Sequence, residues 1–175
     1  MHNITKATPN DAKQLAHVAK EAFLTAHGHS ASKEDIASYL AANFTETNFR
    51  EELTNPDNHY YIIYYQNKIA GYSKITLNTS TKNIASQNIM YMSRLYLLEE
   101  FYGLNLGKEL FNFNIEFSKQ HKQQGVWLAV WTENERAINF YTKRGFHIVG
   151  KYDFKISDTH TNPNHIMYLD FRNLD

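Results

Sequence analysis

Hydrophobic and polar positions repeat along this chain with two different periods. In residues 8–27 apolar side chains recur every three or four positions, which predicts an amphipathic helix. Thr8 as N-cap and Pro9 at the first helical position favour a helix start there. Two shorter helices are predicted at 33–44 and 46–55. The first quarter of the chain is therefore mostly helical after a short strand at its beginning.

The rest of the chain changes to strand patterns with helices between them. A tight turn at residues 66–68 joins two runs that predict an antiparallel hairpin. Gly125 is expected to end the first of the later helices. The remaining strands are predicted at 59–65, 68–78, 88–98, 126–131, 146–156 and 165–171, and the remaining helices at 105–123 and 134–144. A strand–helix–strand unit implies parallel strands, so we expect one mixed α/β domain over residues 1–175, with a central sheet flanked by helices.

Composition excludes several classes of protein. Lys plus Arg equals Asp plus Glu at 18 each, and this balance argues against a nucleic-acid partner. The chain has no cysteine, which excludes disulfides and thiol chemistry. No signal peptide or long apolar run is evident, so we expect a cytoplasmic protein with no membrane partner. Exposed Tyr and Phe on the last strands could support a homodimer.

The stretch RLYLLEEFYGLNLGKEL, residues 94–110, begins as a strand and ends as a helix. Gly103 and Gly107 lie at the entrance of that helix, with Asn105 between them. Glycines before a helix N-terminus let an anion approach unpaired amides, and phosphate suits such a site best. Lys108 adds a positive charge. The alternative is a plain glycine turn with Asn105 as N-cap. Neither a Walker motif nor a dinucleotide fingerprint is present.

A second stretch, VWLAVWTENERAINFYTKRGF, covers residues 126–146 and again leads from a strand into a helix. Thr132 and Glu135 have the spacing of a capping box, which would leave the Asn134 side chain available to another partner. The small side chain of Ala137 leaves space on the helix surface beside Asn134. Tyr141 follows Asn134 by about two turns on the same face. The polar ends of Asn134 and Tyr141 could therefore reach one cleft.

These two stretches together resemble the GNAT acyltransferase superfamily, and the similarity extends over about residues 88–169. YGLNLG occupies the family's phosphate-loop motif, and NERAINFYTKRGF matches its Asn, Ala and aromatic-Tyr motif ahead of Gly-Phe. Within the family the chain is most similar to PaiA-type spermidine/spermine acetyltransferases. It departs from the family at Tyr102, where a Gln or Arg is usual, and at Asn105, where a Gly or Ala is usual.

The resemblance implies acetyl-CoA as cosubstrate, held by a splayed strand pair, and no metal. The backbone of Leu95, Tyr96 and Leu97 would hold the pantetheine arm. Asn134, beside Ala137, would bind the pantetheine or its surroundings, and Tyr141 would be the general acid that protonates the leaving thiolate. The amides that would cradle the pyrophosphate are those of Tyr102, Gly103, Leu104, Asn105, Leu106, Gly107 and Lys108.

The general base of many relatives, a Glu on the strand before the phosphate loop, is missing. Tyr91 stands where that Glu is expected. His27 and His29 are candidates for the base, against the simpler interpretation of two solvated loop histidines, and no third ligand for a metal is evident beside them. Acidic residues of the N-terminal helices could attract a polyamine, although most are expected to be ordinary solvated side chains: Glu34, Asp35, Glu46, Glu51 and Glu52.

Three functions remain open from the sequence. The first is an N-acetyltransferase acting by direct attack on acetyl-CoA, with a polyamine as leading acceptor and a small amine, amino acid or peptide N-terminus next. The second is a non-catalytic acetyl-CoA-binding regulatory module, suggested by Tyr91 and the altered loop. The third, a phosphate or nucleotide binder of another class, is disfavoured by the second motif.

Overall fold

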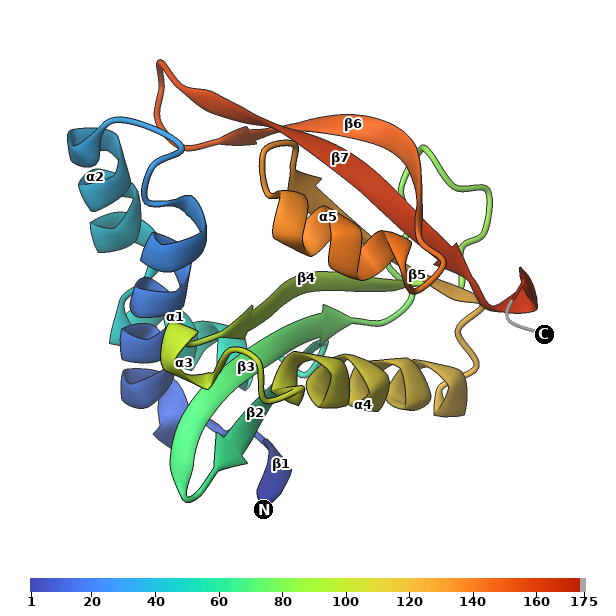
Figure 1. The fold of residues 1–175 in the computed structure, drawn as a ribbon, viewed down its shortest axis with the longest axis horizontal. Helices are drawn as coiled ribbons and strands as arrows, with labels where there is room; N and C mark the ends of the chain where they lie inside the picture. The colour runs from blue at the N-terminus through green and yellow to red at the C-terminus, as the bar shows by residue number, and fades with distance from the viewer. Residues whose placement is uncertain (174–175) are drawn as a thin grey trace. The chain divides into compact units, whose positions relative to one another are not determined.

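The computed structural model describes residues 1–173 and has a mixed α/β fold (Figure 1). One seven-stranded sheet has the order β1-β2-β3-β4-β5-β7-β6. The strands are β1 His2–Lys6, β2 Asn58–Tyr65, β3 Lys68–Thr76, β4 Met90–Leu97, β5 Gly125–Trp131, β6 His147–Lys155 and β7 Thr161–Asp170. The helices are α1 Ala12–His27, α2 Lys33–Asn43, α3 Glu46–Thr54, α4 Leu106–Gln120 and α5 Glu135–Thr142, with short 3-10 turns η1 Pro9–Asp11, η2 Glu99–Phe101 and η3 Phe171–Asn173. The predicted mixed sheet with flanking helices is confirmed.

The chain divides into two compact units. Unit 1 comprises residues 1–75 and 94–114, and unit 2 comprises residues 76–93 and those from 115 onward. Strand β4 and helix α4 each contribute to both units. The single domain over residues 1–175 stays a prediction, and the two units are described separately below.

Unit 1 begins with β1 antiparallel to β2, with His2 opposite Tyr65. The turn from β2 to β3 is made by Gln66 and Asn67, whose φ angles are 48° and 63°. Positive φ at both central residues is the conformation of the type I′ hairpin, as the predicted tight turn requires. Helix α3 packs on α1 and β2. This arrangement places the side chains of α3 beside the strands of the same unit.

The start of the first helix follows the sequence prediction with one refinement. Thr8 is the N-cap and forms a capping box with Asp11, whose Oδ2 accepts from the Thr8 amide at 2.7 Å. The first turn is a 3-10 turn, so α1 itself begins at Ala12. The expected apolar face is buried: Leu15, Val18, Ala19, Ala22 and Phe23.

Unit 2 is built around β5, β7 and β6. Strand β7 runs antiparallel to both neighbours, and Figure 1 shows β6 and β7 as a long twisted hairpin. The start of β4 is parallel to β5, as the strand–helix–strand unit predicts. Among the described residues, the β4–β5 register covers only Met90 with Val126 and Tyr91 with Trp127. Along residues 1–173 no helix combines the length and apolar character needed to cross a membrane.

The prediction that Gly125 ends the preceding helix is wrong. Helix α4 ends at Gln120, and Gly125 is the first residue of β5. A Cβ at Gly125 would lie 2.5 Å from the Leu169 carbonyl oxygen and 2.6 Å from the Tyr168 hydroxyl. The glycine is required by the close approach of β5 to β7, which a sequence window around the helix end does not contain.

Candidate active site

The predicted phosphate loop lies in unit 1, between η2 and α4. Gly103 has a φ of 81° and Asn105 a φ of 60°, both left-handed. A Cβ at Gly103 would meet no atom within 4 Å, so the space above this part of the loop is open. Asn adopts left-handed φ more readily than most residues. The departure at Asn105 therefore fits the backbone that the loop needs.

The start of α4 offers unpaired amides beside this open space. The first helical hydrogen bond is donated by the Glu109 amide to the Asn105 carbonyl, at 3.1 Å. The amides of Leu106, Gly107 and Lys108 precede that bond and so have no partner within the helix. Asn105 is not an N-cap of the usual kind, since its φ is left-handed rather than extended. Amides and the positive end of the helix dipole together favour an anion.

Gly107 has a packing reason as well as the predicted binding reason. A Cβ built there would lie 3.3 Å from Leu97 Cδ1, which is tighter than an ordinary contact. Leu97 ends β4, in the segment Leu95–Leu97 predicted to hold the pantetheine arm by its backbone. The glycine therefore lets the first turn of α4 lie close to the end of β4.

The second predicted group lies on α5 in unit 2. Helix α5 begins at Glu135 with Asn134 as its N-cap, and Asn134 Oδ1 accepts from the Ala137 amide at 3.1 Å. The predicted capping box of Thr132 and Glu135 is therefore wrong. Asn is among the best N-cap residues, and it satisfies an amide of the first turn here. The Nδ2 donor of Asn134 is the part of the side chain that remains for another partner.

Tyr141 lies in the last turn of α5 and is only 8% exposed. Its ring packs against Phe140 and Phe146, with the ring centroids 5.3 Å away in both cases. Burial raises the pKa of the Tyr141 phenol, and the nearby Arg144 only partly opposes this. The hydroxyl therefore keeps its proton at neutral pH, which is the state a general acid needs.

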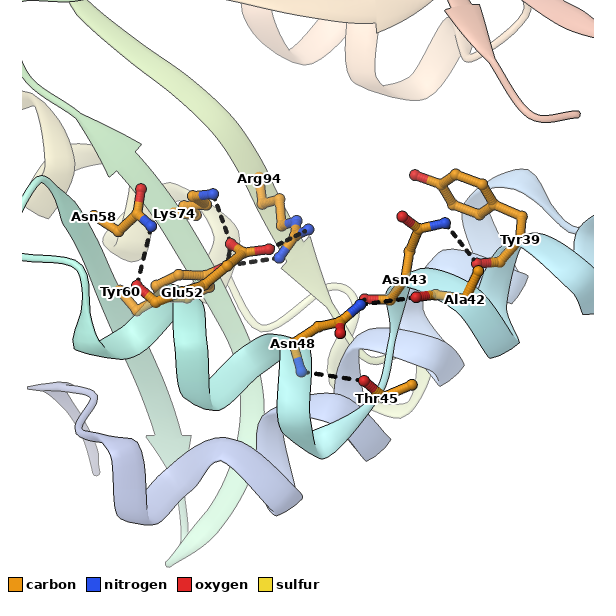
Figure 2. Close-up of polar contacts among 10 residues, drawn as sticks. All are labelled: Tyr39, Ala42, Asn43, Thr45, Asn48, Glu52, Asn58, Tyr60, Lys74 and Arg94. Atoms are coloured by element: carbon orange, nitrogen blue, oxygen red, sulfur yellow. Dashed lines mark hydrogen bonds and ion pairs between the residues drawn. The ribbon is translucent and has the colours of Figure 1, made fainter.

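A buried charged network in unit 1 was not predicted. Figure 2 shows Lys74 from β3 and Arg94 from β4 reaching Glu52 on α3. Lys74 Nζ lies 2.6 Å from Glu52 Oε2 and Arg94 Nη2 lies 3.5 Å from Glu52 Oε1. Tyr60 donates its hydroxyl proton to Glu52 and accepts from Arg94 Nη1 at 2.6 Å. The signal available in the sequence was a Lys and an Arg inside otherwise apolar strands.

This network makes Glu52 unsuitable as a general base. Burial alone would raise its pKa, but Arg94, Lys74 and Tyr60 together lower the pKa below its ordinary value. A carboxylate held in the ionised form by two cations is a weak proton acceptor. Glu52 also differs from the other acidic residues of the N-terminal helices, such as the exposed Glu51, because its charge is already paired.

His27, a predicted candidate for the base, is held beside Tyr96. Its Nε2 lies 3.1 Å from the Tyr96 hydroxyl, and its ring packs on Phe23. Burial, with the neighbouring His29 adding to it, lowers the pKa of His27 to about 4. His27 is therefore neutral at physiological pH, and its imidazole holds a captured proton poorly. The interpretation of His27 as a solvated loop residue is wrong.

The shifted pKa of His27 predicts a pH dependence of folding stability. The folded chain resists protonation of His27 until about pH 4, whereas the unfolded chain takes up that proton from its ordinary pKa of 6.5 downward. Stability is therefore lost as pH falls through this window, by on the order of 3 kcal/mol at its lower end. Urea unfolding at several pH values should show a shallower loss in His27→Gln. The exposed His17 of the same helix gives the control, His17→Gln, and an equal effect of both changes would contradict this account.

The position of the missing glutamate is occupied by a packed aromatic. The Tyr91 ring stacks on Trp127 in unit 2, with ring centroids 3.9 Å apart and planes 15° apart. The position where a glutamate base was expected therefore carries no carboxylate.

Within residues 1–173 no group of three His, Asp or Glu side chains is placed to hold a metal ion.

Comparison with known proteins decides the family. The model of the acetyltransferase (GNAT) family matches residues 18–146. The chain belongs to the GNAT acetyltransferase family. It is 28% identical over 155 residues to an uncharacterized N-acetyltransferase of Lactobacillus delbrueckii subsp. lactis, a match that covers 89% of this chain and 90% of the relative. As a member of this family the chain is an acyltransferase.

Two further similarities concern named GNAT proteins. The chain is 25% identical over 100 residues to the spermine/spermidine N(1)-acetyltransferase of Bacillus subtilis, covering 55% of this chain and 66% of that protein. A crystal structure of PaiA N-acetyltransferase from Thermoplasma acidophilum, in complex with coenzyme A, superposes with a TM-score of 0.78 at 21% identity, covering 98% of this chain and 99% of the other. At that identity the structural likeness supports the GNAT fold.

Proposed function

We propose that this GNAT protein transfers the acetyl group of acetyl-CoA to a primary amine, and that Tyr141 protonates the departing CoA thiolate. The observation that carries the proposal is the loop before α4. It combines left-handed Gly103 and Asn105, open space at Gly103, and amides in the first turn of α4 that have no partner within the helix. This geometry suits the pyrophosphate of CoA, and the coenzyme A complex of the PaiA structure supports the same donor.

The other binding roles follow from the family pattern and stay proposals. The exposed loop residues Gly103, Leu104 and Asn105, with Lys108 in the first turn of α4, would surround the phosphates. The half-buried segment Leu95–Leu97 would hold the pantetheine arm through its backbone. Asn134 would contribute through Nδ2, because its Oδ1 caps α5.

The chemistry needs one proton removed and one proton supplied. Acetyl-CoA supplies an acetyl group activated as a thioester. The amine nitrogen forms the new bond to the acetyl carbon and gives up a proton to solvent, while the carbon–sulfur bond breaks. The Tyr141 hydroxyl gives its proton to the leaving sulfur and regains a proton from solvent before the next cycle. A phenol suits this step because burial keeps it protonated until a thiolate develops beside it.

The removal of the amine proton is assigned to water rather than to Tyr91, Glu52 or His27. Tyr91 is stacked on Trp127, Glu52 is paired with two cations, and His27 has a pKa of about 4. The amine therefore enters the reaction in its neutral form. Turnover should rise with pH as the amine deprotonates, with no change near neutrality from titration of His27.

Two classes of acceptor remain within this proposal. A polyamine is supported by the name of the Bacillus subtilis relative and by the PaiA structure. A small amine, amino acid or peptide N-terminus is the other class. The pairing of Glu52 removes one of the acidic residues expected to attract a polyamine. A homodimer and a cytoplasmic location stay predictions from the sequence.

The donor assignment is tested by equilibrium binding of acetyl-CoA and CoA, followed calorimetrically. We expect binding of both, and competition between them. Binding of nucleotides that CoA fails to displace would overturn the assignment. CoA binding without acetylation of any amine would instead favour a non-catalytic regulatory module.

Replacing Gly107 with leucine should weaken CoA binding by about 10-fold or more, since a bulky side chain there obstructs phosphate and pushes against Leu97. The affinity is measured by calorimetric titration. Asn112→Ala, at an exposed position further along α4, is the control and should leave the affinity nearly unchanged. Unchanged affinity in Gly107→Leu would contradict the role of this loop.

A further inference from the structure

Tyr72, in the middle of β3, carries a buried hydroxyl that is not satisfied. The residue is 0% exposed, and its hydroxyl has no hydrogen-bond partner among the described residues. Its ring lies between the rings of Tyr60 and Tyr96, with centroids 6.4 Å and 6.0 Å away. Native structures leave few buried hydroxyls unpaired, because such a group loses its water without compensation. A missing hydrogen-bonding partner is therefore indicated at Tyr72.

Arg94 has the same deficit in the same cluster. Its guanidinium carries five N–H donors, and two hydrogen bonds are formed with the described residues, to Tyr60 and to Glu52. Phe44 and Phe49 lie against it, with centroids 5.5 Å and 5.2 Å from Cζ. The side chain is 19% exposed, so part of it is accessible to solvent. The remaining N–H donors of a mostly buried guanidinium favour the binding of an oxygen acceptor.

Tyr72 and Arg94 both lie against Tyr60: the Tyr72 ring stacks on the Tyr60 ring at 6.4 Å, and the Tyr60 hydroxyl accepts from Arg94 Nη1 at 2.6 Å. Arg94 and Lys74 bring two positive charges, and Glu52 brings one negative charge. The other titratable groups whose charge acts on Tyr72 or Arg94 are the phenols of Tyr39, Tyr60 and Tyr96. These phenols, like His27 beside Tyr96, carry no charge at neutral pH. Among the described residues, the ion pairs of this cluster join two cations to one carboxylate, Glu52.

We propose that Arg94 and Tyr72 form a subsite for the carboxylate of the amine acceptor, so that the acceptor is an amino acid or a similar amine that carries a carboxylate. A carboxylate accepts several hydrogen bonds at once and suits the planar guanidinium. It adds a second negative charge beside the two cations. A polyamine would instead add positive charge beside Arg94 and Lys74.

The position of the subsite agrees with this role, and this step rests on the proposed function. Arg94 and Tyr96 are two residues apart on β4, so their side chains share one face, about 7 Å apart along the strand. The backbone of Leu95–Leu97 is the segment proposed to hold the pantetheine arm. An acceptor bound through its carboxylate at Arg94 would thus present an amine a few bonds further along this face.

The test uses acceptor pairs that differ only in the carboxylate: lysine with cadaverine, and ornithine with putrescine. Release of CoA thiol from acetyl-CoA gives kcat and KM for each. We expect a lower KM for the carboxylate-bearing member of each pair. Equal KM values within the pairs, or preference for the diamines or for spermidine, would overturn the carboxylate subsite while leaving acetyl transfer in place.

Tyr72→Phe removes only the unpaired hydroxyl and keeps the stacked ring. It should raise the KM for lysine about 10-fold more than the KM for cadaverine, since a hydrogen bond to a charged group is lost. Tyr168→Phe is the matched control, because the Tyr168 hydroxyl is also buried without a partner but lies in unit 2. Tyr168→Phe should change neither the KM for lysine nor the KM for cadaverine. An equal effect of Tyr72→Phe on lysine and cadaverine would show that an ordered water, or nothing, occupies the subsite.

Direct titration of lysine into the protein separates the subsite from the reaction. Lysine binding that weakens in Tyr72→Phe, without thiol release from any amine, would support the subsite and overturn the proposed transfer. Thiol release with amines, without a lower KM for lysine than for cadaverine, would support the proposed transfer and overturn the subsite. Neither binding nor release would overturn both.

Discussion

Replacing Tyr141 with phenylalanine is expected to lower kcat for acetyl transfer by about 100-fold or more, because the leaving thiolate loses its proton donor. The ring would still pack on Phe140 and Phe146, so the fold should be retained. The affinity for CoA should change little, because the hydroxyl acts on the sulfur only as the carbon–sulfur bond breaks. Steady-state thiol release measures kcat, and calorimetry measures the affinity for CoA.

Tyr152→Phe is the control for Tyr141→Phe, since Tyr152 is an exposed tyrosine of β6 in the same unit. It should leave turnover unchanged. Equal turnover in Tyr141→Phe and the original protein would remove Tyr141 from the mechanism. A fall in CoA affinity as large as the fall in kcat would make Tyr141 a binding residue instead of an acid.

The second large effect concerns stability. Glu52→Ala should lower the free energy of unfolding by about 3 kcal/mol, because it leaves Lys74 and Arg94 as uncompensated charges in a mostly buried place. Urea unfolding at neutral pH measures the change. Glu51→Ala, at the neighbouring exposed position of α3, should change stability by less than about 0.5 kcal/mol.

The pH dependence of this difference gives an independent check. The folded-state pKa of Glu52 is lowered, so its contribution is present above its ordinary pKa of 4.5 and is lost as pH falls through the lowered value. The gap between the original protein and Glu52→Ala should therefore shrink in acid. A gap of the same size at low pH, or no gap at pH 7, would contradict the ion-pair account of this cluster.

Local pattern was enough to predict most elements of the fold. The period of apolar residues located α1 and its buried face, and Thr8 and Pro9 marked its beginning. The hairpin was predicted because residues 66–68 form a tight connection between two strand-like runs, and the structure has its turn at Gln66 and Asn67. Parallel pairing of β4 with β5 followed from the strand–helix–strand order. These features are determined by residues close together in the sequence.

The errors arose where distant segments determine the role of a residue. Gly125 is a glycine because β7 approaches it, not because a helix ends there. Glu52 pairs with residues 22 and 42 positions away, so no local window distinguishes it from the solvated acids beside it. The unpaired hydroxyl of Tyr72 depends in the same way on side chains from several elements. The error at the start of α5 is of another kind, since Thr132 and Asn134 are only two residues apart and α5 begins after Asn134.

The most direct test of the account is CoA-thiol release from acetyl-CoA with spermidine, spermine, lysine, cadaverine and simple amines across a range of pH. The account predicts release that depends on a primary amine and that rises with pH as the amine loses its proton. We also expect no titration of His27 near neutrality, since its pKa is about 4. Clear binding of CoA with no release for any amine at any pH would contradict acetyl transfer as the function of this chain.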